Sequence, residues 1–335
     1  MPPGLGSVPA FPAVALKLLP LFANNGSSAA VIAACVSKDP AISGRLIKRA
    51  NYADQACAFE VKSVLQAVLN LGVDRTREIT LEIAMAVHAH SVAPSESSRY
   101  CFHHTLASAL AASEVALQCG LRPDEAHTAA LLHDIGLLGL LHLYPNEYEN
   151  ILAAPESEPG DFLRMERACF GVDHVEAGMW LGRQWYLPKS IIDVIARHHD
   201  EPSGELDLAT VVQVASRLAD LLGFGVSRTS SLDTFEQISA ALPARIRKPL
   251  RSRLRALQAE IVTEITFFEG KDAPPLEIVE FGSDEVEPEE TSPAGPSFAC
   301  LPPSATRSRL PFGVLMAVLT LVIASVALFI LRARV

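Results

Sequence analysis

The chain has 335 residues and 49% of them are apolar, which allows one large domain or two smaller ones with a substantial core. The formal net charge of −10 argues against broad binding of DNA or RNA through phosphates, because such binding needs a basic face. None of the six cysteines belongs to a Cys-x-x-Cys pair, so we expect reduced, packed thiols rather than a disulfide framework.

Residues 9–90 predict a series of helices that begin at capping residues. Pro12 suits the first turn of a helix, and Ser28 and Asp39 are placed to cap the two helices that follow. Gly72 separates two further helices, and this helix–glycine–helix spacing also occurs in DNA-reading motifs. The acidic net charge favours the simpler interpretation, a pair of packing helices. The expected helices cover residues 12–21, 29–37, 40–50, 63–71 and 74–90.

A polar connector over residues 94–98 leads into a histidine-rich part in which helical patterns continue to residue 223. Pro123 opens a helix with acidic residues in its first turn, where the positive end of the helix dipole favours them. No alternation of period two is long enough for a sheet, so residues 9–223 are predicted to be all α-helical. The expected helices of this part cover residues 102–118, 123–134, 137–144, 147–152, 161–170, 175–185, 188–199 and 206–222.

The last part of the chain changes character three times. Residues 245–268 predict an amphipathic helix whose opening carries six basic residues, either as the solvated face of a docking helix or as an attraction to an acidic membrane surface. Residues 269–309, rich in proline and acidic side chains, predict a disordered linker. Residues 310–331 carry no charge, and about 20 such residues at a rise of ~1.5 Å each cross a bilayer core of ~30 Å, so we expect a transmembrane helix there.

The charges beside the predicted transmembrane helix do not orient it, because two arginines stand on each side. The N-terminus lacks the charged start and apolar run of an export signal, which favours a cytoplasmic N-terminal part. We therefore expect a single-pass protein of the inner (cytoplasmic) membrane with the bulk of the chain in the cytoplasm. The expected organisation is a domain over residues 1–225, a helical extension over 226–268, a linker over 269–309 and the membrane helix over 310–331.

An ordered series of histidines and aspartates carries the candidate chemistry. His133 and Asp134 are adjacent, and neighbours on a helix point about 100° apart, so the two can converge on one metal only from a helix end or across a cleft. Mixed nitrogen and oxygen ligands suit a divalent cation such as Fe²⁺, Mn²⁺ or Mg²⁺. The candidate metal ligands are His104, His133, Asp134, His174, His198, His199 and Asp220.

Asp134 is placed to bridge two ions and so to generate a hydroxide that cleaves a phosphate ester, which makes it the candidate catalytic residue if the protein is an enzyme. His174, His198 and His199 would complete the shell of the second ion. For each histidine alone, the simpler interpretation is a hydrogen-bonded core or surface residue. Their order along the chain is what favours a metal site.

His104, the His133–Asp134 pair and Asp220 occur in the order of the HD superfamily of metal-dependent phosphohydrolases. The surrounding sequence resembles one branch of it, the HDOD (HD-related output) domain of bacterial signalling proteins, over about residues 8–223 with an HD-like part from about residue 100. The spacing of an aromatic residue, one further residue, a histidine and a threonine fits that family better with His104 than with His103 as the ligand. The matching segments are Val8–Leu16, Ser37–Asn51, Val64–Gly72, Ala130–Gly136, Phe170–Gly178, Trp185–Pro188 and Ile195–His199.

The resemblance implies an all-helical domain used for regulation, usually without catalysis. The sister branch that cleaves cyclic dinucleotides carries a Gly-Tyr-Pro motif after the paired histidines, whereas here His199 is followed by Asp-Glu-Pro. That branch also has a lysine after the His-Asp-Ile-Gly run, and here the position is Leu137, which can neither hold a phosphate nor donate a proton. Ligand residues without substrate-handling residues favour a structural or sensing metal site, or a relic of one.

We therefore expect a membrane-tethered signalling or scaffold protein that binds a partner protein or a nucleotide messenger, with no nucleic acid as a partner. The alternative is a metal-dependent phosphodiesterase or phosphatase that uses His104, His133, Asp134 and Asp220. The divalent metal is the one cofactor that either interpretation implies.

Overall fold

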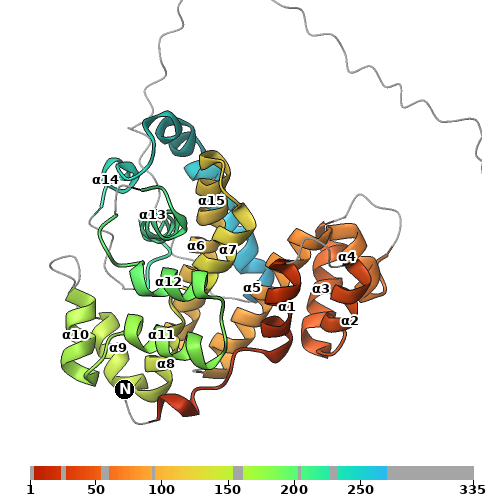
Figure 1. Ribbon diagram of the computed structural model, residues 1–335, viewed down its shortest axis with the longest axis horizontal. Coiled ribbons are helices and arrows are strands. Elements are labelled where there is room, and N and C mark those ends of the chain that lie inside the picture. The colour runs from red at the N-terminus through yellow and green to blue at the C-terminus, as the bar shows by residue number, and fades with distance from the viewer. Residues whose placement is uncertain are drawn as a thin grey trace, which may run out of the picture. The chain divides into compact units, whose positions relative to one another are not determined.

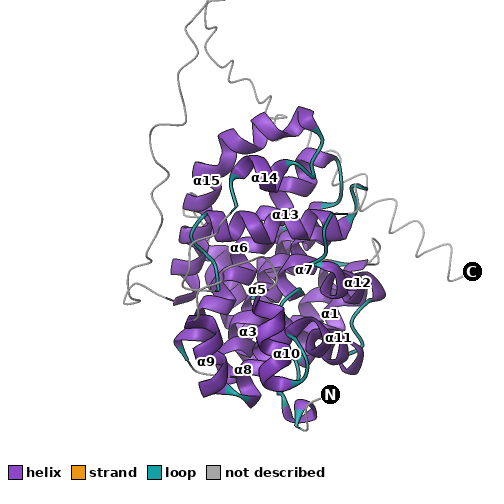
Figure 2. Ribbon diagram, turned by 90° about the vertical axis from the view of Figure 1, so that its left-hand side faces the viewer, coloured by secondary structure: helices purple, strands orange, loops and turns teal. Residues whose placement is uncertain are grey.

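The computed structural model describes residues 4–23, 28–53, 60–92, 95–153, 161–202, 205–226 and 233–269, all of which belong to one compact unit. Helices are the regular structure throughout these ranges, which confirms the all-α prediction (Figures 1 and 2). Glu269, the first residue of the predicted linker over residues 269–309, is the last residue of α15 (Ala244–Glu269). The rest of that linker and the predicted transmembrane helix over residues 310–331 lie outside the described residues. The first helices are the short 3-10 helix η1 (Leu5–Ser7), α1 (Ala13–Ala23), α2 (Ala29–Val36), α3 (Pro40–Ala53), α4 (Val64–Leu71) and α5 (Val73–Val92).

The later helices follow the predicted order, with the short α14 as an addition. They are α6 (Glu96–Cys119), α7 (Pro123–Leu132), α8 (Ile135–Leu143), α9 (Pro145–Ala153), α10 (Asp161–Phe170), α11 (His174–Gln184), α12 (Lys189–Arg197), α13 (Leu208–Leu221), α14 (Phe235–Ser239) and α15 (Ala244–Glu269). The connector expected over residues 94–98 is shorter than predicted, because Ser95 caps α6 and that helix begins at Glu96. The helix expected over residues 123–134 ends at Leu132, because His133 and Asp134 form a turn that separates α7 from α8.

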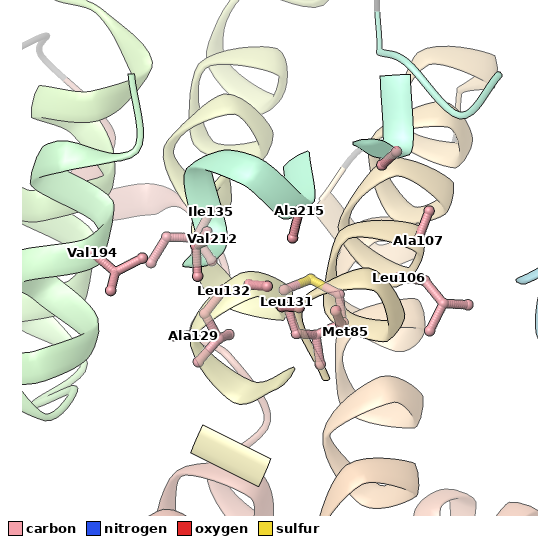
Figure 3. Packing of buried hydrophobic residues seen from close by; sticks show 14 of the residues in the cluster. Met85, Leu106, Ala107, Ala129, Leu131, Leu132, Ile135, Val194, Val212 and Ala215 are labelled. Carbon is pink, nitrogen blue, oxygen red and sulfur yellow. The ribbon is translucent and has the colours of Figure 1, made fainter. Parts of the chain in front are cut away.

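Two apolar cores hold the helices together. The smaller core joins α1 to α4 with one face of α5, and it contains Ile32, Leu46 and Val68. The larger core surrounds α6, α7 and α13, and Figure 3 shows Leu132 of α7 near Val212 of α13 and Leu131 on the side of Met85. The predicted caps are in place, since the Ser28 side chain accepts from the Val31 amide and the Asp39 side chain from the Ile42 amide.

One long apolar stretch of the described chain contains the His133–Asp134 pair. Residues Pro123–Leu143, which include α7 and α8, are long and apolar enough to cross a membrane, but 89% of the most apolar window is buried inside the fold. Such burial is expected of core helices in a globular domain. The stretch therefore carries the hydrophobic core around the site.

Helix α15 lies antiparallel to α6, since Arg253 pairs with Glu114 at 3.2 Å near one end and Glu269 contacts His103 at 2.6 Å near the other. Arg49 of α3 pairs with Glu264 of α15 in a contact that is nearly buried on both sides. Other basic side chains of α15 are also used within the fold, and Arg247 donates to the Leu242 carbonyl at 3.0 Å. These contacts favour the docking-helix interpretation of residues 245–268 over the membrane-surface one.

Candidate metal centre

The turn between α7 and α8 presents the His133–Asp134 pair. His133 is the C-cap of α7 and Asp134 is the N-cap of α8, so both side chains project from helix ends, as the adjacency required. Gly136 in the next turn lets α8 approach α11 closely, since a Cβ placed there would lie 1.9 Å from the carbonyl oxygen of His174. The absence of a side chain at Gly136 therefore allows His174 to lie next to Asp134.

The predicted ligands gather around Asp134 in two groups. In the first, ligand atoms of Asp134, His174, His198 and His199 lie within 4.8 Å of one another. In the second, atoms of His104, His133 and Asp134 meet the same limit. Asp134 is common to both groups, and the cluster could bind a metal.

The hydrogen bonds behind three of these histidines fix which ring nitrogen faces the cluster. The Nδ1 atoms of His133 and His198 lie 2.5 Å and 2.8 Å from the carbonyl oxygens of Ala130 and Ile195, each three residues back in its own helix. A carbonyl only accepts, so each Nδ1 carries the proton and each Nε2 offers a lone pair. The Nδ1 of His174 lies 2.7 Å from Glu166 Oε2, which gives that ring the same tautomer in its neutral form.

The Nε2 atoms then point toward one carboxylate and one another. They lie 3.2 Å (His133), 3.1 Å (His198) and 3.6 Å (His174) from the Asp134 oxygens. The His174 and His199 Nε2 atoms are 2.9 Å apart, so that either one of them carries a proton and donates a hydrogen bond to the other, or a cation lies between or beside them. Neutral rings held in this tautomer are the form in which histidine binds a metal.

Two buried atoms of the cluster lack a hydrogen-bond partner within the described part of the chain, namely His133 Nε2 and Asp134 Oδ1. A buried polar atom without a partner is costly, and a bound cation would satisfy both atoms at once. The donor set of imidazoles and a carboxylate is one that divalent cations accept. The residues present therefore fit a divalent metal.

The electrostatics of the cluster keep Asp134 negative. Burial would raise the pKa of Asp134, but His133 and His198 hold that pKa well below its ordinary value. Burial would lower the pKa of His174, yet Glu166 and Asp134 together raise it to about 9. Without metal, the proton that His174 gains therefore occupies a position that a divalent cation would take, and metal binding would release that proton.

The structure separates the two neighbouring histidines of α6. His104 faces the cluster, with Nε2 3.6 Å from Asp134 and Nδ1 3.0 Å from the Phe224 carbonyl. His103 points away and contacts Glu269 at 2.6 Å. Burial lowers the pKa of His104, but Asp220 and Asp134 outweigh burial and raise it to about 9.

Asp220 is near the site but outside both ligand groups. Its Oδ1 lies 3.2 Å from His104 Nδ1, the ring nitrogen opposite the one that faces Asp134. In this arrangement Asp220 supports His104 from behind, and its role as a direct ligand stays a prediction. Glu166 was missed by the sequence reasoning, because a single glutamate in α10 carries no motif that marks it as the partner of His174.

Comparisons with known proteins agree with the fold described above. The model of the HDOD domain matches residues 8–201. An HDOD domain protein with unknown function from Geobacter sulfurreducens aligns with a TM-score of 0.64 and 22% identity, covering 78% of this chain and 93% of that one. A proposed signal transduction protein from Marinobacter aquaeolei gives a TM-score of 0.63 and 18% identity, covering 79% of this chain and 60% of that one.

Two further relatives point toward phosphoester chemistry in other proteins. A proposed phosphohydrolase from Shewanella amazonensis aligns with a TM-score of 0.56 and 21% identity, covering 79% of this chain and 96% of that one. Ribonuclease Y of Thermus thermophilus is 26% identical over 194 residues, which are 58% of this chain but 25% of that protein. The solved structures share the fold with this chain, and the ribonuclease match spans about a quarter of its length.

Proposed function

This chain belongs to the HDOD family of the HD superfamily, and from that membership we propose that it is a regulatory signalling protein with a divalent metal at Asp134 and little or no catalysis. The domain would bind a partner protein or a nucleotide messenger. The metal, which we propose to be Fe, Mn or Mg, would be held by His104, His133, Asp134, His174, His198 and His199. It would fix four helix ends and the interior of α6 in one arrangement.

The observation that carries this proposal is the position of Leu137. It follows directly after the His-Asp-Ile-Gly run, and its side chain is 2% exposed and packed in the larger core. A cation at this place would be needed to hold the phosphate of a substrate, and an apolar side chain in the core cannot do so. Six candidate ligands lie together, whereas this position carries no side chain that could bind a phosphate.

The membrane segment is part of the proposal. Residues 310–331 would anchor the chain in the inner membrane, and residues 269–309 would set how far the cytoplasmic domain reaches from it. The test is extraction of membranes with alkaline carbonate. The full chain should stay with the membranes, and a chain ending at residue 309 should be released. Release of both chains would remove the membrane part of the proposal.

A second function, metal-dependent phosphohydrolysis, is favoured by one observation. The two ligand groups share Asp134, an arrangement that suits two ions bridged by one carboxylate. A bound ion would supply Lewis acidity and activation of water. Asp134 would then be the shared ligand, and His104 and His133 would hold one ion while the other three histidines held the second.

One set of assays on the purified full chain in detergent distinguishes between the two proposed functions. Cyclic dinucleotides, a simple phosphate ester and an RNA oligonucleotide are incubated with Mn²⁺ or Fe²⁺, and equilibrium binding of the same nucleotides is measured in parallel. The regulatory proposal expects no turnover, together with nucleotide binding or capture of a defined signalling partner. Turnover that disappears in Asp134→Ala would replace it with the hydrolase, and absence of turnover, nucleotide binding and partner capture would remove both.

A further inference from the structure

We propose that Glu166 is the positioning residue of the metal centre and that its negative charge, rather than its shape, makes His174 a strong ligand. The inference rests on the proposed metal site and assigns a role to a residue outside the ligand groups. It concerns the ligand group of Asp134, His174, His198 and His199.

Glu166 is fully buried, at 0% exposure, and both carboxylate oxygens are used. Oε2 accepts from the backbone N–H of His174 at 2.8 Å and from its Nδ1 at 2.7 Å. Oε1 accepts from the hydroxyl of Tyr148. One side chain of α10 therefore holds both the backbone and the ring of the first residue of α11, and Tyr148 of α9 holds the carboxylate in turn.

His174 is oriented differently from His133 and His198, two other buried histidines of the cluster. His133 and His198 are each oriented by a neutral backbone carbonyl of their own helix. His174 begins its helix, and the carbonyls of that helix lie beyond it, so a carbonyl three residues back along the same helix is not available to its ring. A carboxylate from another helix orients the ring instead, and it adds a negative charge that a carbonyl does not.

That charge costs free energy when it is placed in the core. An ionised carboxylate taken out of water without a strong partner is unfavourable by several kcal/mol. Among the described residues, the cation that pairs with Glu166 is His174 itself, at 2.7 Å. Glutamine would accept the same two hydrogen bonds from His174 and face the Tyr148 hydroxyl with its amide, so the hydrogen bonds alone do not require a charge.

A charged partner on Nδ1 does have one clear effect on the opposite nitrogen. It strengthens the hydrogen bond that Nδ1–H donates, increases the electron density of the ring and makes Nε2 a better metal ligand. The His174 Nε2 lies 3.6 Å from Asp134 Oδ1 and 2.9 Å from His199 Nε2, at the centre of the four-residue group. Glu166 therefore tunes the metal affinity of the group that contains His174.

The test compares Glu166→Gln with Glu176→Gln in the full chain. Glu176 is exposed on the same helix, two residues beyond His174, and its substitution is the matched control. Binding of Mn²⁺ is measured by electron paramagnetic resonance, and the visible spectrum of the Co²⁺-loaded protein reports the ligands. We expect Glu166→Gln to weaken Mn²⁺ binding by about 10- to 100-fold and to change the Co²⁺ spectrum, with Glu176→Gln unchanged.

Equal Mn²⁺ affinity and equal Co²⁺ spectra in Glu166→Gln and the wild type would overturn the inference while leaving the metal site in place. Failure of the wild type itself to bind either ion would overturn the proposed metal centre instead. A measurement on the wild type covers the case in which Glu166→Gln does not fold. In the Zn²⁺-loaded, ¹⁵N-histidine-labelled chain, the Nδ1 proton of His174 should resonate further downfield than those of His133 and His198, and an equal or higher-field position would contradict the charged partner.

Discussion

The close contact of α8 with α11 gives the sharpest prediction about how the fold builds the site. A Cβ on Gly136 would lie 1.9 Å from the His174 carbonyl oxygen, 2.4 Å from the Gly178 nitrogen and 2.8 Å from the Gly178 Cα. All three are backbone atoms, so no side-chain rotation can relieve the overlap. In Gly136→Ala the two helices must therefore separate by roughly 1 Å or more before ordinary contact distances return.

The cost follows from that separation. Overpacking a well-packed core costs about 1–3 kcal/mol, and a clash with backbone lies at the upper end or above. We therefore expect Gly136→Ala to lose about 3 kcal/mol or more of the free energy of unfolding, a large fraction of the ~5–15 kcal/mol of a typical domain. Because His174 begins α11, the same shift moves its ring away from Asp134, and Mn²⁺ affinity should fall with the stability.

Urea unfolding of the metal-free full chain, followed by circular dichroism, measures the stability, and an Mn²⁺ titration measures the site. Gly44→Ala in α3 is the matched control, because nothing lies within 4 Å of a Cβ at Gly44. Alanine is the better helix former, so this variant should gain about 0.5–1 kcal/mol. A Gly136→Ala protein within about 0.5 kcal/mol of the wild type and with unchanged Mn²⁺ affinity would refute the reasoning.

Three further predictions concern the rest of the fold. Burial and the nearby His142 lower the pKa of His88 from 6.5 to about 4, so between these pH values His88 is protonated in the unfolded chain and neutral in the folded chain. The contribution of neutral His88 to the free energy of unfolding is fully present above pH 6.5 and falls by up to about 3 kcal/mol as the pH drops toward 4. The variant His88→Phe should therefore show a weaker pH dependence of the urea midpoint between pH 4.5 and 7. An unchanged pH dependence would exclude His88 as its source. Glu264→Ala removes the nearly buried partner of Arg49 and should lower the free energy of unfolding by about 3 kcal/mol. Glu260→Ala, in a half-exposed pair with Arg253, should lower it by less than about 1 kcal/mol, and equal losses in the two variants would contradict the burial argument. Ser63→Ala removes the N-cap of α4 and should lower the melting temperature by an amount equivalent to about 1 kcal/mol, and no change would mean that the cap adds nothing.

Periodicity and capping residues were sufficient to predict much of the fold. The amphipathic pattern placed a helix over residues 245–268, and α15 runs from Ala244 to Glu269. Which basic residues of that helix would be paired could not be predicted, because their partners, such as Glu114, lie far away in the sequence. The helix boundary was predicted between residues 134 and 137, whereas α7 ends at Leu132, since Leu-Leu-His-Asp-Ile is apolar enough to continue a helix by two residues.

The candidate site shows the same division between what is local and what is not. The order of histidines and aspartates predicted a cluster, and six of the seven named residues lie in the two ligand groups around Asp134. Sequence spacing could not show that Asp220 lies behind His104, or that Glu166 lies behind His174, because both contacts depend on how separate helices cross. Orientation of a ligand by a distant side chain is a tertiary property, and a motif records only the ligands.

The central claim is that Asp134, together with the imidazoles of the two ligand groups, forms a binding site for a divalent cation. Equilibrium dialysis of the purified full chain against Mn²⁺, with metal content determined by mass spectrometry, tests it most directly in the wild type and in Asp134→Ala. Because both ligand groups contain Asp134, the account predicts at least one bound ion per chain in the wild type and none in Asp134→Ala. A wild type that binds none of Mn²⁺, Fe²⁺ or Mg²⁺, or an Asp134→Ala protein that binds as much as the wild type, would contradict it.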